Sequence, residues 1–369
     1  MRIPKGRRLF ALAIALDLSL LGLVWLALRY PAAFEEIYTR GFFAWYAETA
    51  GWLSDRIPFS VHEAIGLVLF LLVLRATARF VLRLCGRRQA RRRGIGATLQ
   101  GIFVTLSLAA CAFYLLWGLN YFRPRLVHSS CFDKGLVTVE RSTALAQNCL
   151  SALIALAGTA CPPDRILAEE MQTCVHNAMR LIGDRPLATA VRVKYFLGGW
   201  LSALPSTGVT LPLLPENHVS LDLFDYEKPF IIAHEKAHLQ GRAMESEANY
   251  LALLACLSSE HPSIRKSGVF FLFRMLLRTL PPGERAHLIS LLPDEYRQDL
   301  RAPAIRLAQK SAFVVALFQA LYGNFLKAQR IEDGLANYSA ALTLVLGFRL
   351  NSGQTLAIDG RGRLVRETE

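Results

Sequence analysis

The sequence lacks the features of a cysteine-bound zinc domain and holds few acidic residues. Only seven cysteines occur among 369 residues, and no two of them have the CxxC spacing, so a cysteine zinc site is disfavoured. Acidic residues number 29 against 42 Lys and Arg, which leaves a net charge of +13. We find no internal repeat and no low-complexity linker. The apolar segments and the histidines therefore carry most of the information.

Long apolar runs are confined to the first third of the chain. Residues 9–28, 64–84 and 97–117 each approach the roughly 20 residues that cross about 30 Å of hydrocarbon. The first run exceeds the roughly 7–15-residue core of a signal peptide, and no good cleavage site follows it, so we interpret it as a retained span. After Trp117 no run is long enough, and a segment such as 269–280 is expected to be a core helix.

Positive charge gathers at the ends of these runs. Basic clusters precede the first run and separate the second from the third, whereas the loop between the first and second is far less basic. The positive-inside rule then places the N-terminus in the cytoplasm and everything after Trp117 outside it. We therefore predict a multi-pass protein of the cell (inner) membrane, with the lipid bilayer as a partner. The net charge follows from this topology, and no nucleic-acid partner is expected.

Two charged residues lie inside the apolar runs. Asp17 is roughly 12 Å from the inner end of its run, and Arg75 roughly 13 Å from the inner end of its own. A charge at this depth is costly and usually has a partner, so the matching depths predict an Asp17–Arg75 ion pair. Alternatively, Arg75 extends to the interface while Asp17 is protonated or faces the third run.

The chain after Trp117 predicts one helix-rich α+β domain. Apolar residues recur at helical spacing in 137–157 and 163–182, and short β-branched strands are expected between residues 191 and 223. Five cysteines follow the last span, so at least one is expected to stay free or to pair between chains, and Cys256 is expected to be a buried thiol. The predicted parts are a three-helix transmembrane anchor (1–118), an extracytoplasmic domain (119–350) and a polar, loosely ordered tail (351–369).

Residues 234–238 read His-Glu-Lys-Ala-His, an HExxH pattern. Residues four apart share a helix face, so His234 and His238 can bind one metal ion. Glu235 lies beside them and can take a proton from a metal-bound water, whose pKa zinc lowers to about 7. Taken alone, the pattern also fits an amphipathic helix that carries two histidines by chance.

A catalytic zinc needs a third protein ligand. Gly241 follows the second histidine by three residues and predicts the end of the helix, and a second helix is expected to begin near Met244. Its first turn would direct Glu245 back to the metal. Asn249 would share that face and could hydrogen-bond a ligating histidine. Glu247 is the alternative third ligand.

The segment from HEKAHLQG to ESEAN resembles zincin metallopeptidases of the glutamate-ligand type. More specifically, the chain is similar to a bacterial membrane family of unknown function, domain of unknown function thirty-eight-ten. The resemblance rests on the three spans, WGLNY at 117–121, HExAH at 234–238, ExEAN at 245–249 and a G-x-x-x-Y stretch at 334–338. It implies a zincin-like fold and a zinc site, but it supplies no substrate.

Further residues follow from this resemblance. The G-x-x-x-Y match makes Tyr338 the candidate for stabilising the oxyanion, although a tyrosine packed between helices with a satisfied hydroxyl is the alternative. In zincins a strand before the motif pairs with extended substrate, and residues 207–213 or 218–223 would be that edge. His218 is expected to be a solvated or satisfied side chain. The family tends toward Gly-Glu-Ala where this chain has Pro-Glu-Asn, so a role for Glu216 at the cleft is in doubt.

The combined prediction is a mostly helical α+β protein with three N-terminal transmembrane helices and a zincin-like metallopeptidase domain that contains a small sheet. His234, His238 and Glu245 bind Zn²⁺, and Glu235 is the general base toward water and later the proton donor. The substrates are peptides or proteins outside the cytoplasm. The alternatives are a non-catalytic envelope protein with a structural or sensory zinc site, and a zinc-dependent cell-wall amide hydrolase.

Overall fold

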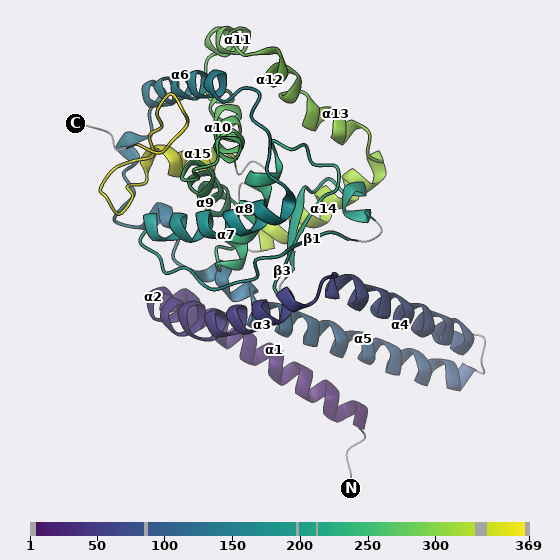
Figure 1. Cartoon of the computed structure of the whole chain (residues 1–369). Helices are drawn as coiled ribbons and strands as arrows, with labels where there is room; N and C mark the ends of the chain where they lie inside the picture. The colour runs from purple at the N-terminus through teal and green to yellow at the C-terminus, as the bar shows by residue number, and fades with distance from the viewer. Residues whose placement is uncertain (1–4, 85–87, 197–198, 212, 329–337, 366–369) are drawn as a thin grey trace. The chain divides into compact units, whose positions relative to one another are not determined.

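A computed structural model shows that the chain forms two compact units. The membrane unit comprises Met1–Tyr46, Ser60–Arg123 and Pro212–Leu214, and the α+β unit comprises Ala47–Phe59, Pro124–Leu211 and Pro215–Glu369. The structure describes the whole chain except residues 1–4, 85–87, 197–198, 212, 329–337 and 366–369 (Figure 1). Part of the connection between the first two spans, residues 47–59, thus belongs to the α+β unit.

The membrane unit contains the three predicted apolar helices. Within α1 (Lys5–Arg29), α4 (Val61–Leu84) and α5 (Arg88–Leu116), the segments Arg8–Arg29, Val61–Arg79 and Gly96–Leu116 are long and apolar enough to cross a membrane. These helices agree with the expectation of a membrane protein. The shorter helical segments are α2 (Pro31–Phe34), the π-helix η1 (Glu35–Phe43), α3 (Ala44–Arg56), which continues into the α+β unit, and the 3-10 helix η2 (Gly118–Phe122).

The predicted Asp17–Arg75 ion pair is wrong. Asp17 faces α5, where its carboxylate accepts a hydrogen bond from Ser107 Oγ at 2.8 Å and contacts Cys111 Sγ at 3.8 Å. Arg75 is exposed on α4 and has no ion pair within the described part of the chain. The matching depths of Asp17 and Arg75 in the membrane were not sufficient to predict an ion pair. The rotation of each helix about its own axis decides which neighbour a side chain contacts.

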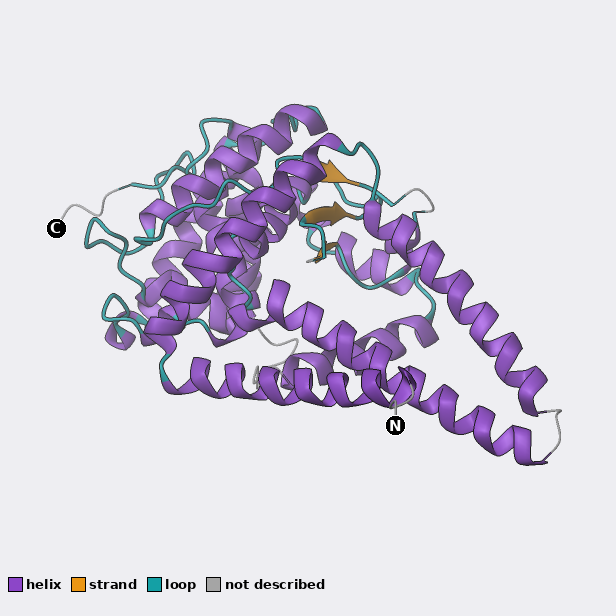
Figure 2. Cartoon of the chain, turned by 90° about the horizontal axis from the view of Figure 1, so that it is seen from below, coloured by secondary structure: helices purple, strands orange, loops and turns teal. Residues whose placement is uncertain are grey.

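The α+β unit is built around α9 (Glu245–Leu257). Its sequence, ESEANYLALLACL, is apolar on every side after the first turn, and most of its residues are buried. It packs against α7 (Asp164–Leu181), α8 (Lys228–Leu239), α10 (Pro262–Leu276) and α15 (Tyr338–Gly347). Helices dominate this unit and its strands are short (Figure 2).

The remaining helices of the α+β unit are α6 (Val139–Ala155), α11 (Pro282–Ser290), α12 (Asp294–Asp299), α13 (Ala302–Ala308) and α14 (Ala312–Ala328). The 3-10 turns are η3 (Leu126–His128), η4 (Lys134–Leu136) and η5 (Trp200–Ala203).

The described strands form one small mixed sheet in the order β1-β3-β2. β1 (Val193–Lys194) pairs in parallel with β3 (Glu216–Val219), and β2 (Gly208–Leu211) pairs with β3 in antiparallel fashion. The central position of β3 excludes residues 218–223 as the substrate-pairing edge. β2 is an edge strand, and of the two candidate edges it alone remains.

The described part of the C-terminal tail is packed, contrary to the prediction of a loosely ordered segment. Leu356 and Ile358 are buried in the main core, and Leu364 N donates to the carbonyl of Leu257 at the end of α9. Ile358 also forms a β-bridge with Leu364. These three apolar side chains help to hold the polar segment against the core.

The cysteines of the described part of the chain are all free thiols. Cys149, Cys174 and Cys256 are buried, which confirms the prediction for Cys256, while Cys131 is exposed. No disulfide therefore contributes to the described structure of the α+β unit.

Packing of the tail can be tested with two glycines that share a backbone conformation. Gly362 and Gly353 have φ of 69° and 82°, so alanine at either costs about 1–2 kcal/mol of strain. A Cβ at Gly362 would lie 2.7 Å from Val269 Cγ2, whereas one at Gly353 would meet nothing within 4 Å. Gly362→Ala should therefore lower the free energy of unfolding by about 1–3 kcal/mol more than Gly353→Ala. Thermal unfolding in detergent measures both, and equal losses would show that the tail is not tightly packed.

Candidate metal centre

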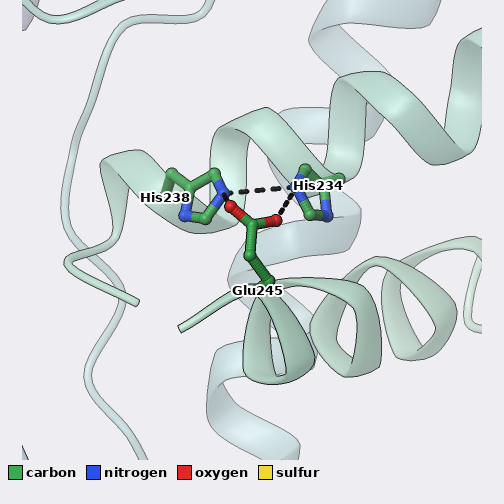
Figure 3. Close-up of side chains that lie close together, drawn as sticks. All are labelled: His234, His238 and Glu245. Atoms are coloured by element: carbon green, nitrogen blue, oxygen red, sulfur yellow. Dashed lines mark hydrogen bonds and ion pairs between the residues drawn. The ribbon is translucent and has the colours of Figure 1, made fainter. Parts of the chain in front are cut away.

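The HExxH residues lie on α8, as the spacing predicted. Pro229 occupies its first turn, where a missing N–H costs nothing, and Ile231 and Ile232 are buried in the core. His234 and His238 are four residues apart and share one face of the helix. His234 Nε2 and His238 Nε2 are 3.2 Å apart (Figure 3).

The turn after α8 returns the chain to these imidazoles. Gly241 has φ of 75°, the left-handed conformation expected at the end of a helix, and α9 begins at Glu245. Glu245 Oε2 is 3.2 Å from His234 Nε2, and Glu245 Oε1 is 3.7 Å from His238 Nε2. The three side chains converge from two helices on a single point (Figure 3).

These distances suit a tetrahedral metal ion. Bonds of about 2.0–2.1 Å to a tetrahedral zinc place neighbouring ligand atoms about 3.3 Å apart. The one ligand atom that each of the three side chains offers lies within 4.8 Å of the others. Two imidazole nitrogens and one carboxylate are three candidate protein ligands, the number that catalytic zinc sites use, with water in the fourth position. The three side chains are partly accessible, with exposed fractions of 13%, 8% and 20% for His234, His238 and Glu245.

The ring of His238 is held in the orientation that a metal ligand needs. Its Nδ1 donates to the Arg242 carbonyl at 2.8 Å, because a carbonyl oxygen can only accept. In the neutral imidazole, Nε2 then carries the lone pair on the side of Glu245. The sequence interpretation had given Asn249 this supporting role. In the described structure no hydrogen bond joins Asn249 to either histidine, and the backbone of Arg242 supports His238 instead.

Glu247, the alternative third ligand, is occupied elsewhere. One of its carboxylate oxygens accepts from the guanidinium of Arg242 at 3.1 Å, and the other accepts from Leu126 N at 2.7 Å. Arg242 also donates to Asp184 at 2.5 Å. Glu247 thus fixes the turn between α8 and α9, and Glu245 is the glutamate that faces the histidines.

Glu235 lies beside the candidate ligands in a buried position. Its Oε2 accepts from Thr210 Oγ1 of β2 at 2.8 Å. β2 passes so close that a Cβ on Gly208 would stand 2.5 Å from Glu235 Oε1. Burial raises the pKa of Glu235, while the charges of His234 and His238 oppose that rise.

The candidate ligands influence one another strongly. Burial raises the pKa of Glu245, but the histidines outweigh it and hold that pKa well below its usual range. Burial lowers the pKa of His238, but Glu245 outweighs it and raises the pKa to about 9. The Glu245 carboxylate is therefore ionised, whereas His238 would have to release its proton to bind a metal ion.

Two residues near the site were missed by the sequence interpretation. Tyr322 on α14 donates from its hydroxyl to Glu245 Oε1 at 2.6 Å across 77 residues of sequence. Lys236, inside the motif, is fully buried and donates to Gln172 Oε1 at 2.9 Å and to the Val191 carbonyl at 2.8 Å. Burial lowers the pKa of Lys236 to about 7. No local pattern marks Tyr322, whereas Lys236 shares a helix face with the apolar residues Ile232 and Leu239, which could have signalled its burial.

The structure describes one of two further predicted residues, His218, but not the side chain of the other, Tyr338. Tyr338 is the first residue of α15, but its side chain lies outside the described part of the structure, as does Gly334, so the oxyanion role stays a prediction. His218 is fully buried, stacks on Phe196 with ring centroids 4.2 Å apart and lies 3.4 Å from Glu216. It is thus a buried core residue and not a solvated one.

Glu216 takes no place at a cleft rim. It is fully buried and lies 2.5 Å from Lys194 Nζ of β1. The pair joins two neighbouring strands of the sheet, so Glu216 has a structural role, in agreement with the doubt that the sequence raised.

The three spans, the helical α+β unit and its small sheet define a membrane protein with a candidate metal centre between two core helices. A family model described as Protein of unknown function (DUF3810) matches residues 38–346. The match covers most of the chain, and the chain belongs to this family. No curated protein and no solved structure matches it.

Zinc content distinguishes the two glutamates of α9. Glu245→Ala removes one of three ligands, and we expect the purified protein to fall from about one zinc per chain to near none. Glu247→Gln keeps the size of the side chain and leaves the ligand set intact, so zinc should be retained. Elemental analysis of the detergent-purified variants measures this. Zinc loss from Glu247→Gln with retention in Glu245→Ala would reverse the assignment.

The contact from Tyr322 predicts an effect on metal affinity. Tyr322→Phe removes the hydrogen bond to Glu245, and groups that orient a ligand typically contribute about tenfold or more to affinity. We expect zinc to bind about tenfold more weakly in a competitive chelator titration. Tyr250→Phe is the control, because the buried Tyr250 hydroxyl has no hydrogen-bond partner in the described structure. Unchanged affinity in Tyr322→Phe would show that Tyr322 does not orient the ligand.

Proposed function

We propose that this protein is an integral-membrane zinc metallopeptidase with a zincin-like α+β domain. The observation that carries the proposal is the convergence of His234, His238 and Glu245 at 3.2–3.7 Å, with Glu235 buried beside them. Three N/O ligands, an open position and an adjacent carboxylate are the donor set of metal-assisted hydrolysis.

Zinc, Glu235 and Thr210 would have separate roles in hydrolysis. Bound zinc would supply a water molecule of lowered pKa. Glu235 would act as the base toward that water and later as the proton donor to the leaving amine. A raised pKa suits this role, because a more acidic carboxylate would be a weaker base toward the water. Thr210 holds one oxygen of Glu235 in place.

The substrate proposed for this site is an extended peptide. β2 is an edge strand and carries the Thr210 that contacts Glu235, so a peptide added beside β2 would run past the general base. Main-chain hydrogen bonds would hold such a substrate with little dependence on its side chains. The proposed substrates are therefore peptide or protein segments rather than small amides.

The proposed location of the site is outside the cytoplasm. One basic cluster precedes the first span and another lies between the second and third, and the positive-inside rule assigns both to the cytoplasm. The α+β unit then faces away from the cytoplasm, where peptides outside the cell (inner) membrane are within reach.

Glu235→Gln tests the function directly. The substitution keeps the size of the side chain and the ligands but removes the base, so zinc content should stay at about one per chain. Hydrolysis of a quenched-fluorescence peptide library should fall by about 10²–10⁴-fold. The measurement uses full-length protein in nanodiscs. Glu169→Gln, on the exposed surface of α7, is the control and should behave as wild type.

Two outcomes would contradict the proposal. If the wild-type protein binds zinc but Glu235→Gln hydrolyses peptides equally well, the activity belongs to another site or to a contaminant. If the zinc-loaded protein cleaves no library peptide, the centre is a structural or sensory zinc site, or it acts on a cell-wall amide.

A further inference from the structure

α14 carries an apolar stripe that the α+β unit leaves uncovered. No charged residue occurs from Ala312 to Leu326. Phe313, Leu317 and Leu321 are 75%, 47% and 64% exposed. Their spacing of four residues places them along one side of the helix over about 12 Å. Large apolar side chains in such a row are costly in water, and a stripe of this kind marks a contact surface.

A different side of α14, about 100° around the helix axis from the stripe, is fixed to the α+β unit. Tyr322 donates to Glu245 at 2.6 Å, and the ring of Phe318 stacks on Tyr322 with centroids 5.5 Å apart. Val314 and Val315 are half-buried. α14 therefore cannot leave this unit to cross a membrane on its own without breaking the contact to the candidate metal ligand.

The occupant that best fits the stripe is a lipid bilayer. Together with the preceding segment, Asp294–Ala308, the segment Ala312–Asn324 is as long and apolar as a span, but the two are bent by 96°. An uncharged stripe offers nothing to an acidic or basic protein partner. The three candidate spans tether the chain to a bilayer, which raises the effective concentration of lipid far above that of any soluble partner.

We propose that α14 lies on the membrane surface, with Phe313, Leu317 and Leu321 inserted among the lipids and Tyr322 directed at Glu245. One helix then contacts the bilayer on one side and a candidate metal ligand on another. Such interfacial helices bury their apolar face about 5–10 Å into the boundary between headgroups and acyl chains. The contact does not depend on the proposed peptidase activity, but it would bring the candidate metal centre to substrates held at the membrane.

Site-specific photo-cross-linking tests this proposal in the full-length protein. Benzoylphenylalanine is placed at Leu317, at the half-buried Phe318 of the same helix, or at Ile154 of α6, which is 52% exposed. The three proteins are reconstituted in phosphatidylcholine–phosphatidylglycerol nanodiscs and irradiated, and lipid adducts are counted by mass spectrometry. Val315 replaces Phe318 if that variant does not fold.

An interfacial helix predicts at least about fivefold more lipid adduct at Leu317 than at either other position. Equal adducts at Leu317 and Phe318 would mean that the whole helix is embedded, which overturns the proposal. The proposal would also be overturned if Leu317 formed no more lipid adduct than Ile154. Cross-links from Leu317 to a second copy of the chain would overturn it as well. Because the readout needs neither zinc nor hydrolysis, its failure is independent of failure of the proposed function.

Discussion

The geometry of the candidate centre depends on the buried charge of Arg242. Its guanidinium lies between Asp184 and Glu247, at 2.5 Å and 3.1 Å, while its carbonyl accepts from His238. A buried guanidinium without partners would cost several kcal/mol, so these contacts hold each other in place. They join the segment after α7 to α8 and α9. The turn that directs Glu245 toward the histidines is thereby fixed from three sides.

Glu235 and Lys236 are the charged residues between the two histidines of the motif, and they extend this network in different directions. Glu235 contacts Thr210 of β2, while Lys236 donates to the Val191 carbonyl. The amides of Val191 and Arg192 in turn donate to Asp55. This chain of contacts explains why residues 47–59, which precede the second span, belong to the α+β unit. α8 is thus fixed on both sides by polar contacts and along its length by core packing.

Features encoded over a few residues could be predicted from the sequence. The three apolar helices, the HExxH helix and its end at Gly241 all follow from composition and spacing. So does the start of α9 close to the predicted position. Glu245 was preferred over Glu247 because the first turn of a helix that follows a tight turn can face backward. The structure agrees, since Glu245 lies at the histidines and Glu247 at Arg242.

By itself, the sequence determined the membrane helices, the helix-rich α+β class and the residues that converge near the histidines. These depend on short-range periodicity and on the backbone preferences of single residues. Only the tertiary structure decided that Asp17 meets Ser107, that the C-terminal tail packs into the core and that Tyr322 reaches Glu245. Each of these contacts joins segments far apart in the chain. Helix rotation and packing determine such contacts, and neither leaves a local pattern in the sequence.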